Sequence, residues 1–462
     1  MRVSSVLRSS RVRQVMAVPL AACLFGGLAL VTSAPLGASI AATAATRTLS
    51  ASSSGCVKGT AQGVTSSTVT LAVTEVAISG GALTNATIGV PSTQVQENDW
   101  NTVAQSINKS GGAGCRKIQL KFFPVNPLDA AGAQQECLTI AASKPFMVLD
   151  VGALSAINAS NCIPTAKVAY ASQYLTPDQL TKYFPYYLQL LGVPVSDLRN
   201  SVLGFNQLGY FKPSKGFKKL GVLYDTCNPA LIVAERAALK QAGVPKSKIV
   251  EFNLGCPAGQ TFTQSILQPA VLAFKNAGVT AVTSAAAGTS AAIFTQVAGQ
   301  QNYKPQYLLA SDTVALPNTT GSDVPDSANL NNAVNVTGQA YGEETAPGFT
   351  PGPGTQKCNG LFRGPGNTTV YKSLDGYEGV ACNYLWYVQG ILNHATSLQP
   401  AQLPVALHAV GTVQFSYPFG PVNYTAAPKK APYGVGYWRA ETYVSSCKCW
   451  HIPNPTWNPP FK

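Results

Sequence analysis

A cysteine stands where a short apolar run gives way to a helical pattern, in the stretch KKLGVLYDTCNPALIVAERAALKQAGV, residues 218–244. In that place Cys227 has three chemical roles open to it: a catalytic thiol, a metal ligand or one half of a disulfide. A thiol nucleophile needs a histidine beside it. The chain has only three histidines, His394, His408 and His451, and all lie far along the sequence. The choice among the roles therefore depends on the other cysteines and on the fold.

Motifs of the common catalytic classes are missing from the sequence, which has no G-x-S-x-G, no Walker loop and no H-E-x-x-H. The GGAG at residues 111–114 follows a helical pattern, so it predicts a turn and not a dinucleotide loop. Cys447 and Cys449 would need zinc ligands from elsewhere. We therefore expect no catalytic residue, no metal site and no cofactor. One enzyme alternative remains, which relies on carboxylates at predicted strand ends: Asp150, Asp225 and Asp312.

The N-terminus has the composition of an export signal. Arginines come first, an apolar stretch covers residues 15–31, and Ala-Thr-Ala at residues 42–44 fits a cleavage site. We therefore predict a signal peptide over residues 1–44 and an extracellular or cell-envelope location. Two alternatives stay open: Cys23, in Leu-Ala-Ala-Cys, resembles a lipobox and would carry a lipid anchor, and the apolar stretch could remain as an uncleaved anchor.

The sequence has enough hydrophobic residues for a core but few charged residues for its surface. Hydrophobic residues make up 46% of the 462 residues and charged residues 11%, which suits two or more domains. The formal net charge is +13, yet the basic residues are scattered and form no stripe with interleaved aromatics, so we expect no nucleic-acid partner. Removal of Cys23 from the 11 cysteines leaves an even number, which favours disulfides in an exported protein.

Strand and helix patterns alternate in two series, after a stretch at residues 45–66 that we expect to be a flexible leader. The first series has strands at residues 68–76, 116–125, 144–152 and 163–170 and helices at 97–108 and 130–143. The second has strands at 220–225, 248–254, 279–284 and 306–310 and helices at 230–242, 263–277 and 290–301. A long helix at 377–395 and a strand-like tail at 412–450 follow. Short apolar strands alternating with helices predict an α/β fold of two doubly wound, parallel-sheet lobes.

The predicted sheets give Cys227 a partner. Cys227 and Cys256 follow the first and second strands of the second series, and neighbouring strands lie about 4.8 Å apart, within reach of a disulfide. We therefore predict a bond between them. Similar reasoning pairs two cysteines of the first series and joins a loop to the long helix: Cys137 with Cys162, and Cys358 with Cys382. Four cysteines stay unassigned: Cys56, Cys115, Cys447 and Cys449.

The order of these elements resembles the type I periplasmic binding proteins, in particular the branched-chain amino-acid (Leu/Ile/Val-type) substrate-binding proteins of ABC transporters. The resemblance spans about residues 64–450 and is carried by GVTSSTVTLAVT, INKSGGAGCRKIQLKFFPV, the stretch around Cys227, NAGVTAVTSAAAGTSAAIFTQVAGQQNYKPQYLLASD and YEGVACNYLWYVQGILNHA. It implies two lobes joined by three crossing strands, which we expect near residues 203–210, 312–316 and 410–416. Lobe 1 would then hold residues 67–203 plus 316–410, and lobe 2 residues 204–315 plus 411–455.

The resemblance also implies a ligand site between the lobes. Family members grip the ligand's α-carboxylate with a Ser/Thr-rich loop after the third strand, and Ser155 is the hydroxyl of the matching stretch DVGALS. Ser172 and Gln173 follow the fourth strand, and Asp312 in LLASDT matches the acid that meets the ammonium group. Asp225, at a strand end of the second series, completes the expected ligand-binding set.

We therefore expect an exported solute-binding protein that captures a small polar ligand, such as an amino acid or an amide, and delivers it to an ABC permease without chemistry. We expect a monomer that meets the membrane only through the permease or a lipid anchor. A sensory or regulatory binding module on the same fold is the first alternative, and a secreted carboxylate-based enzyme is the second. Glu75, at the end of the first strand, receives no role.

Overall fold

The computed structural model describes residues 56–78, 90–155, 159–173, 175–227, 229–257, 262–286, 289–310, 326–340, 343, 346–364, 377–417 and 419–461. The predicted signal peptide, the cleavage site and the candidate ligand residue Asp312 lie outside these ranges. Among the described residues, none of the helices combines the length and the apolar character that a membrane span requires.

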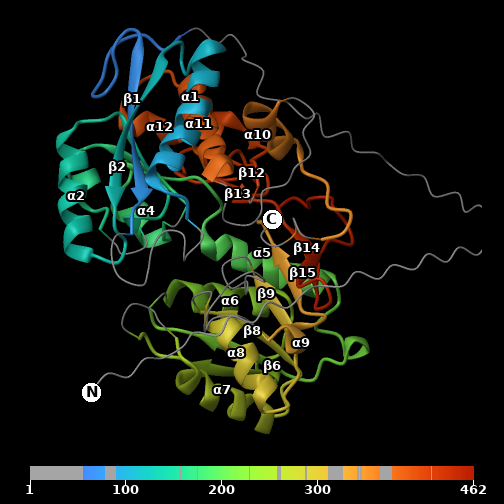
Figure 1. The fold of residues 1–462 in the computed structure, drawn as a ribbon. Helices are drawn as coiled ribbons and strands as arrows, with labels where there is room; N and C mark the ends of the chain where they lie inside the picture. Colours follow the sequence, from blue (N-terminus) through green and yellow to red (C-terminus); the bar gives the residue numbers. More distant parts are fainter. Residues whose placement is uncertain are drawn as a thin grey trace, which may run out of the picture. The chain divides into compact units, whose positions relative to one another are not determined.

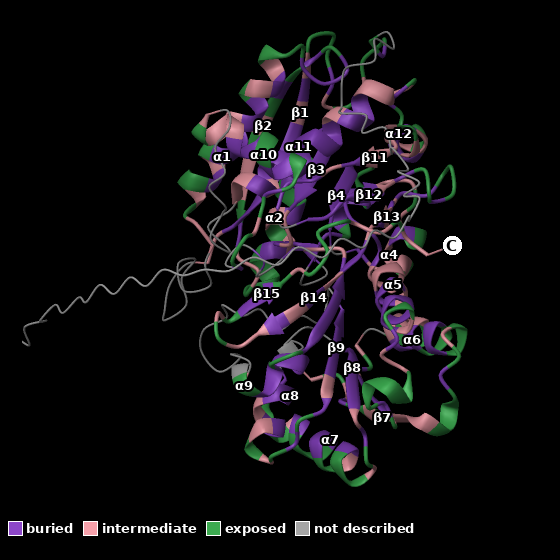
Figure 2. Cartoon of the chain, turned by 90° about the vertical axis from the view of Figure 1, so that its right-hand side faces the viewer, coloured by how far each residue is buried: buried purple, intermediate pink, exposed green. Residues whose placement is uncertain are grey.

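The first sheet is wholly parallel and has the order β2-β1-β3-β4-β5. Its strands are β1 (Thr68–Val76), β2 (Lys117–Val125), β3 (Met147–Asp150), β4 (Ala169–Ser172) and β5 (Tyr187–Gln189). The two central strands β3 and β4 are buried at every residue (Figure 2). Strands buried on both faces read as continuous apolar runs, which is why the sequence pattern located them.

Helices cover both faces of this sheet: α1 (Thr93–Lys109), α2 (Ala130–Ala142), α3 (Cys162–Thr165), α4 (Pro177–Lys182), α10 (Pro353–Arg363), α11 (Tyr377–His394) and α12 (Leu403–Val410). The long helix α11 packs against α1 and α12 beside β1 (Figure 1). Its apolar residues form one core with the β1 side chains Leu71 and Val73. The opposite face, which includes Ala72 and Tyr170, forms a second core with α2.

The second sheet repeats the first and then extends it. Its strands are β6 (Leu220–Tyr224), β7 (Ile249–Asn253), β8 (Ala281–Ala285), β9 (Gln306–Ala310), β10 (Val334–Thr337), β14 (Arg439–Val444) and β15 (Cys449–His451). In the order β15-β14-β10-β9-β8-β6-β7, strands β6 to β10 are parallel and follow the same pattern as β1 to β5. Strands β14 and β15 pair antiparallel, so this sheet is mixed, whereas the sequence patterns predicted a parallel one.

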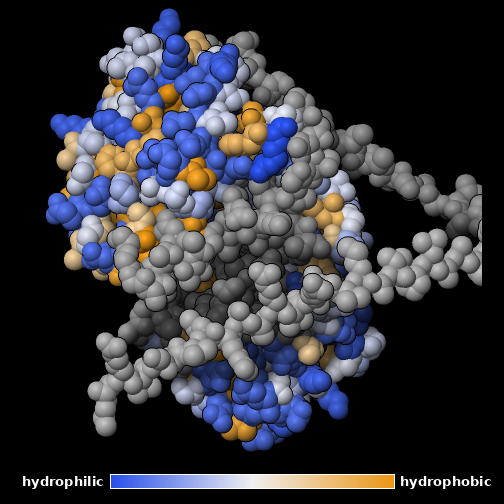
Figure 3. Space-filling model, in the orientation of Figure 1, coloured by the Kyte–Doolittle hydropathy of each residue, from blue (hydrophilic) through white to orange (hydrophobic). Residues whose placement is uncertain are grey.

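Five further helices belong to this half of the chain: α5 (Pro194–Gln207), α6 (Pro229–Gln241), α7 (Gln264–Asn276), α8 (Thr289–Gln300) and α9 (Ser327–Leu330). Short 3-10 turns lie at Pro213–Lys215, Lys246–Lys248 and Pro400–Gln402, and a small antiparallel sheet joins β11 (Thr412–Val413), β12 (Val422–Asn423) and β13 (Val435–Gly436). Hydrophilic side chains predominate on the described part of the face in Figure 3, with apolar ones scattered among them.

One predicted strand is wrong in its first half. Residues 163–170 begin as the short helix α3, and β4 starts only at Ala169. Pro164 lacks the N–H that a central strand must donate, whereas its fixed φ suits the first turn of a helix. Cys162, at the start of this helix, bonds to Cys137 in α2.

The chain passes between the two sheets three times, at places that differ from the expected crossings. Residues 203–210 do not form a crossing strand, because α5 already packs against α6, β9 and β10 of the second sheet. The first pass therefore precedes α5, where Gly192 pairs with Gly434 of the third pass. The second pass follows β10. Residues 334–337 of β10 pair with β9 and so belong to the second sheet, whereas they were expected in lobe 1. The third runs from β11 to β14 and includes residues 412–416 of the expected 410–416.

The stretch expected as a flexible leader is structured from Cys56 onward. Cys56 bonds to Cys115, and the Arg116 guanidinium donates hydrogen bonds to the carbonyls of Gly59 and Thr65. The sequence did not predict the partner of either cysteine. The Cys56–Cys115 disulfide ties this stretch to the residues just before β2.

Five disulfides join the ten described cysteines, and three are the predicted pairs: Cys137–Cys162, Cys227–Cys256 and Cys358–Cys382. The other two are Cys56–Cys115 and Cys447–Cys449. Cys227 is thus a disulfide half, because the ends of β6 and β7 lie side by side. Cys227 is therefore neither a free thiol nor a metal ligand. The described residues contain no group of three or more His, Cys, Asp or Glu that could hold a metal ion.

Loss of the Cys227–Cys256 bond should destabilise the protein measurably. The two cysteines lie 29 residues apart, so replacement of both by serine should lower the free energy of unfolding by about 3–4 kcal/mol on the chain-entropy estimate. Cys447 and Cys449 lie 2 residues apart, and the same double replacement there should cost about 1.5 kcal/mol. Denaturant unfolding of the two variants measures this difference, and equal losses would contradict the expectation.

Candidate ligand-binding site at the strand ends

Both sheets have a point beside their first strand where the strand order reverses, between β1 and β3 and between β6 and β8. Ligands of open α/β sheets bind outside the carboxyl ends of the strands at such points. The residues there are therefore the first candidates for a site.

Asp150 ends β3 at this point and is fully buried. Its carboxylate accepts hydrogen bonds from the hydroxyls of Thr74 (2.7 Å), Ser155 (2.6 Å) and Tyr170 (2.6 Å). It also accepts bonds from the backbone N–H groups of Leu154 and Ser155, both at 3.0 Å. Five donors thus bind the buried Asp150 carboxyl group, which belongs to none of the ion pairs of the described residues, and the loop that follows β3 is folded around it.

The expected ligand residues of the first sheet lie close together. The hydroxyl oxygens of Ser155 and Ser172 are 3.1 Å apart, and both side chains belong to the network around Asp150. Gln173 directly follows β4, and its backbone carbonyl accepts a hydrogen bond of 2.7 Å from the Gln189 amide. The side-chain oxygen of Gln173 is buried and has no hydrogen-bond partner, so it retains acceptor capacity.

Glu75, to which the sequence patterns assigned no role, lies at the carboxyl end of β1 and is 1% exposed. One of its carboxylate oxygens is buried without a hydrogen-bond partner. Burial raises the pKa of Glu75 to about 7, and the nearby Glu97 adds to the shift. An acid inside an otherwise buried strand was the signal available in the sequence, but only the structure shows that it lacks a partner.

The second sheet also brings polar groups to its carboxyl end. Asp225 follows β6, is 1% exposed and accepts a hydrogen bond of 3.0 Å from the backbone N–H of Cys227. The Cys227–Cys256 disulfide and a bond from the Thr226 N–H to the Gly255 carbonyl fix this loop to the end of β7. Asp225 is thus held by its own loop, while Asp312, the other acid expected here, lies outside the described residues.

No protein-family model matches the sequence, and no curated protein matches it. Solved structures match along most of the chain. A fatty acid ABC transporter substrate-binding protein from Thermomonospora curvata has 16% identity and a TM-score of 0.57, covering 86% of this chain and 94% of its own. An ABC transporter substrate-binding protein from Desulfitobacterium hafniense in complex with Leu has 13% identity and a TM-score of 0.57, with coverage of 83% and 99%.

A third match is an ABC transporter solute-binding protein from R. palustris in complex with 4-hydroxybenzoate, with 13% identity, a TM-score of 0.55 and coverage of 86% and 96%. Another is a type I periplasmic binding protein from Bordetella pertussis Tohama I, with 14% identity, a TM-score of 0.55 and coverage of 85% and 99%. This chain has the type I periplasmic binding protein fold. The matched structures named here are binding proteins, and three of them are binding proteins of ABC transporters.

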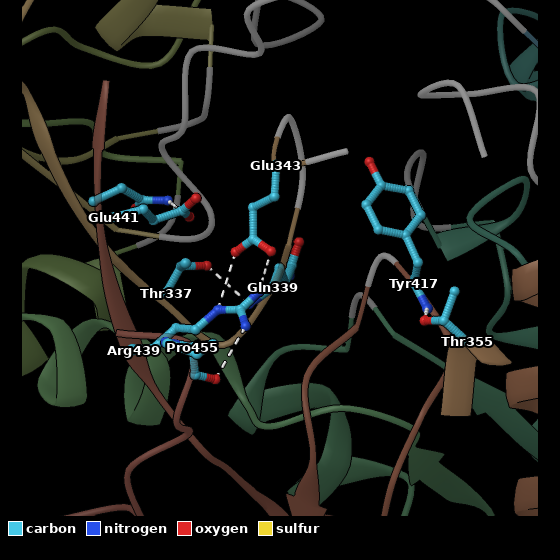
Figure 4. Close-up of polar contacts among 9 residues, drawn as sticks. Thr337, Gln339, Glu343, Thr355, Tyr417, Arg439, Glu441 and Pro455 are labelled. Carbon is cyan, nitrogen blue, oxygen red and sulfur yellow. Dashed lines mark hydrogen bonds and ion pairs between the residues drawn. The ribbon is translucent and has the colours of Figure 1, made fainter. Parts of the chain in front are cut away.

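In this type I fold the second and third passes are tied together by a buried ion pair. Arg439, at the start of β14, pairs with Glu343 of the second pass, and both side chains are nearly inaccessible (Figure 4). The guanidinium also lies 3.9 Å from the centroid of the Trp457 ring. Because the two partners come from different passes, the pair links the segments that connect the two sheets.

A second carboxyl lies beside this pair. Glu441 of β14 is opposite Asn335 of β10, whose amide donates a hydrogen bond of 2.7 Å to it. Burial, followed by the neighbouring charge of Glu343, raises the pKa of Glu441 well above its ordinary value. Burial and the neighbouring carboxylate thus favour the neutral form of Glu441 beside the Arg439–Glu343 pair.

Buried acids in this fold should make its stability depend on pH. Burial raises the pKa of Glu235, in α6, from 4.5 to about 8, so the native state binds more protons than the unfolded state between these values. Stability should fall as pH rises through this window and level off above it. Glu235→Gln should flatten the slope and leave the variant more stable than the wild type at pH 9. Melting temperatures from pH 5 to 9 measure this, and parallel profiles would contradict it.

Proposed function

We propose that this chain is an exported solute-binding protein that captures a small polar molecule at the carboxyl ends of its two sheets and delivers it to an ABC permease. The observation that carries the proposal is the repeated strand order of two sheets joined by three passes, in a chain that matches transporter binding proteins over 83% to 86% of its length. Such a protein performs no chemistry, and its ligand shifts the equilibrium toward a closed state.

Two features support the location and the role. Five disulfides suit an oxidising compartment outside the cytoplasm. Polar side chains at the ends of β1, β3, β4 and β6 include groups with unused acceptors, Glu75 and Gln173, which a ligand would satisfy. The domain division proposed here follows the three passes, with β6–β10, β14 and β15 in one lobe.

Thermal melting in the presence of a metabolite panel tests the proposal. A binder at 100 times its dissociation constant should raise the free energy of unfolding by about 2.7 kcal/mol. Gln173→Met should reduce that gain, whereas Gln241→Met, at the exposed end of α6, should leave it unchanged. Flat melting curves across amino acids, amines, amides, sugars and small acids would contradict a solute-binding role.

A further inference from the structure

The loop that would grip an anionic ligand is already occupied. In the family that the sequence resembles, the loop after the third strand holds the ligand's carboxylate. Here the corresponding donors, the N–H groups of Leu154 and Ser155 and the Ser155 hydroxyl, all bind the carboxylate of Asp150. A second carboxylate at the same donors would meet a buried negative charge without a cation. The loop is therefore poorly suited to an anion.

Three of the unused polar atoms near this loop are acceptors. One carboxylate oxygen of Glu75 and the amide oxygens of Gln173 and Gln96 are buried and unpartnered. The Gln96 amide nitrogen donates to the carbonyls of Val76 (3.0 Å) and Pro91 (2.8 Å). The amide oxygen of Gln96 is therefore the atom without a partner. Three unpaired acceptors at one edge call for a partner that supplies N–H or O–H donors.

The strand register places Glu75 and Gln173 in one row. Val73 lies opposite Leu149 and Asp150 opposite Ser172, so continuing the register puts Glu75 opposite Val151 and Val151 opposite Gln173. With strands about 4.8 Å apart, the α-carbons of Glu75 and Gln173 are roughly 10 Å apart. A small molecule between them would reach both side chains.

Both residues also lie on one face of the sheet. In β1, Leu71 and Val73 belong to the core beneath α11, and in β4 so do Ala169 and Ala171, while their neighbours face the other core. Side chains alternate along a strand, so Glu75 shares the face of Val73. Gln173, two residues after Ala171, continues the same face at the end of β4.

No cation among the described residues pairs with Glu75. None of the three ion pairs among the described residues includes Glu75, and its charged neighbour Glu97 carries the same sign. A buried carboxylate is costly unless it is paired or hydrogen-bonded. A cation from outside the chain would supply both the opposite charge and the donors.

We infer that the ligand is a small organic cation with N–H donors, a primary ammonium or a guanidinium, and that it binds Glu75 with Gln173 as a second acceptor. This inference rests on the proposed function and specifies its ligand class. The first sheet would then bind a cation. The resemblance implied instead that Ser155 of this sheet binds the ligand's carboxylate.

Calorimetric titration of the exported protein with putrescine, agmatine and guanidinium tests the inference. Choline, which has no N–H, and succinate and leucine serve as comparison ligands. At least one N–H cation should bind, and Glu75→Gln should weaken it by at least about tenfold, because one partner of a buried charge pair is lost. Glu235→Gln makes the same change at a buried, unpartnered acid in α6, and should leave the cation affinity unchanged.

The outcomes separate the two proposals. Binding of succinate or leucine without binding of any N–H cation would overturn the ligand class and keep the solute-binding role. Cation binding that Glu75→Gln leaves unchanged would also overturn the inference. Failure of every compound in this set and in the melting panel would overturn the proposed function itself. Melting temperatures of both variants show that each remains folded.

Discussion

Replacing Arg439 with methionine should lower the free energy of unfolding by about 3–5 kcal/mol. The change leaves the Glu343 carboxylate, whose side chain is 0% exposed, without its cation. It also removes the contact between the guanidinium and the Trp457 ring. Equilibrium unfolding in urea, compared with the wild type at the same pH, measures the loss.

The chain offers a matched control for this prediction. Arg236 pairs with Glu251 at 2.6 Å, but its side chain is 49% exposed, so Arg236→Met should cost at most about 1 kcal/mol. The double change Arg439→Met with Glu343→Leu should recover part of the loss, because no uncompensated charge remains. Equal losses at the two arginines would contradict the role given to the buried pair.

Asp150→Asn should cost at least about 3 kcal/mol, since the single acceptor oxygen of an amide cannot accept from all five donors that surround the carboxylate. The new NH₂ group would itself face donors. Asp129→Asn is the matched control: Asp129 caps α2 through a bond from the Gly132 N–H, and asparagine caps a helix about as well. Its effect should stay within about 0.5 kcal/mol.

Measurement of the two aspartate variants by urea unfolding decides this prediction. A small loss at Asp150 would mean that the loop after β3 does not depend on the carboxylate. The bonds from its N–H groups and the Ser155 hydroxyl to Asp150 would then contribute little to stability, and an anionic ligand could compete for these donors. The experiment therefore tests both the stability of the loop and the reason for preferring a cation.

The sequence predicted the repeated elements because buried parallel strands leave a strong local signal. The apolar run at Leu220–Tyr224, followed by a helical pattern, located β6 and α6. The same geometry predicted the Cys227–Cys256 bond, since it depends only on two adjacent strand ends. These features follow from periodicity and strand spacing alone.

Other features depend on long-range packing that local patterns do not contain. The α5 helix begins with Pro194 and buries Leu198, Val202 and Phe205 at helical spacing, but its position on the second sheet, and so the place of the first pass, is a tertiary property. The strand β14 alternates between buried and half-buried residues, but this alternation does not show which strand it pairs with or in which direction. The direction of β14 was therefore not predictable.

The candidate site also combines features that the sequence predicted with features that only the structure shows. Asp150 was recognised as a strand-end carboxylate, yet nothing in the sequence indicated that Thr74 and Tyr170 would satisfy it. Ser155 matched the expected position of a ligand hydroxyl, but its donors are used within the protein. Glu75 became a candidate only when the structure showed a buried oxygen without a partner.

A high-resolution crystal structure of the protein purified from its native cells tests the central claim most directly, because a tightly held solute survives purification. We predict density for a small molecule at the carboxyl ends of the strands, in contact with Glu75 or Gln173 from the first sheet and with residues that follow β6, β8 or β9 from the second. A solute bound elsewhere, or strand ends filled by the chain's own side chains with no room for a solute, would contradict the claim.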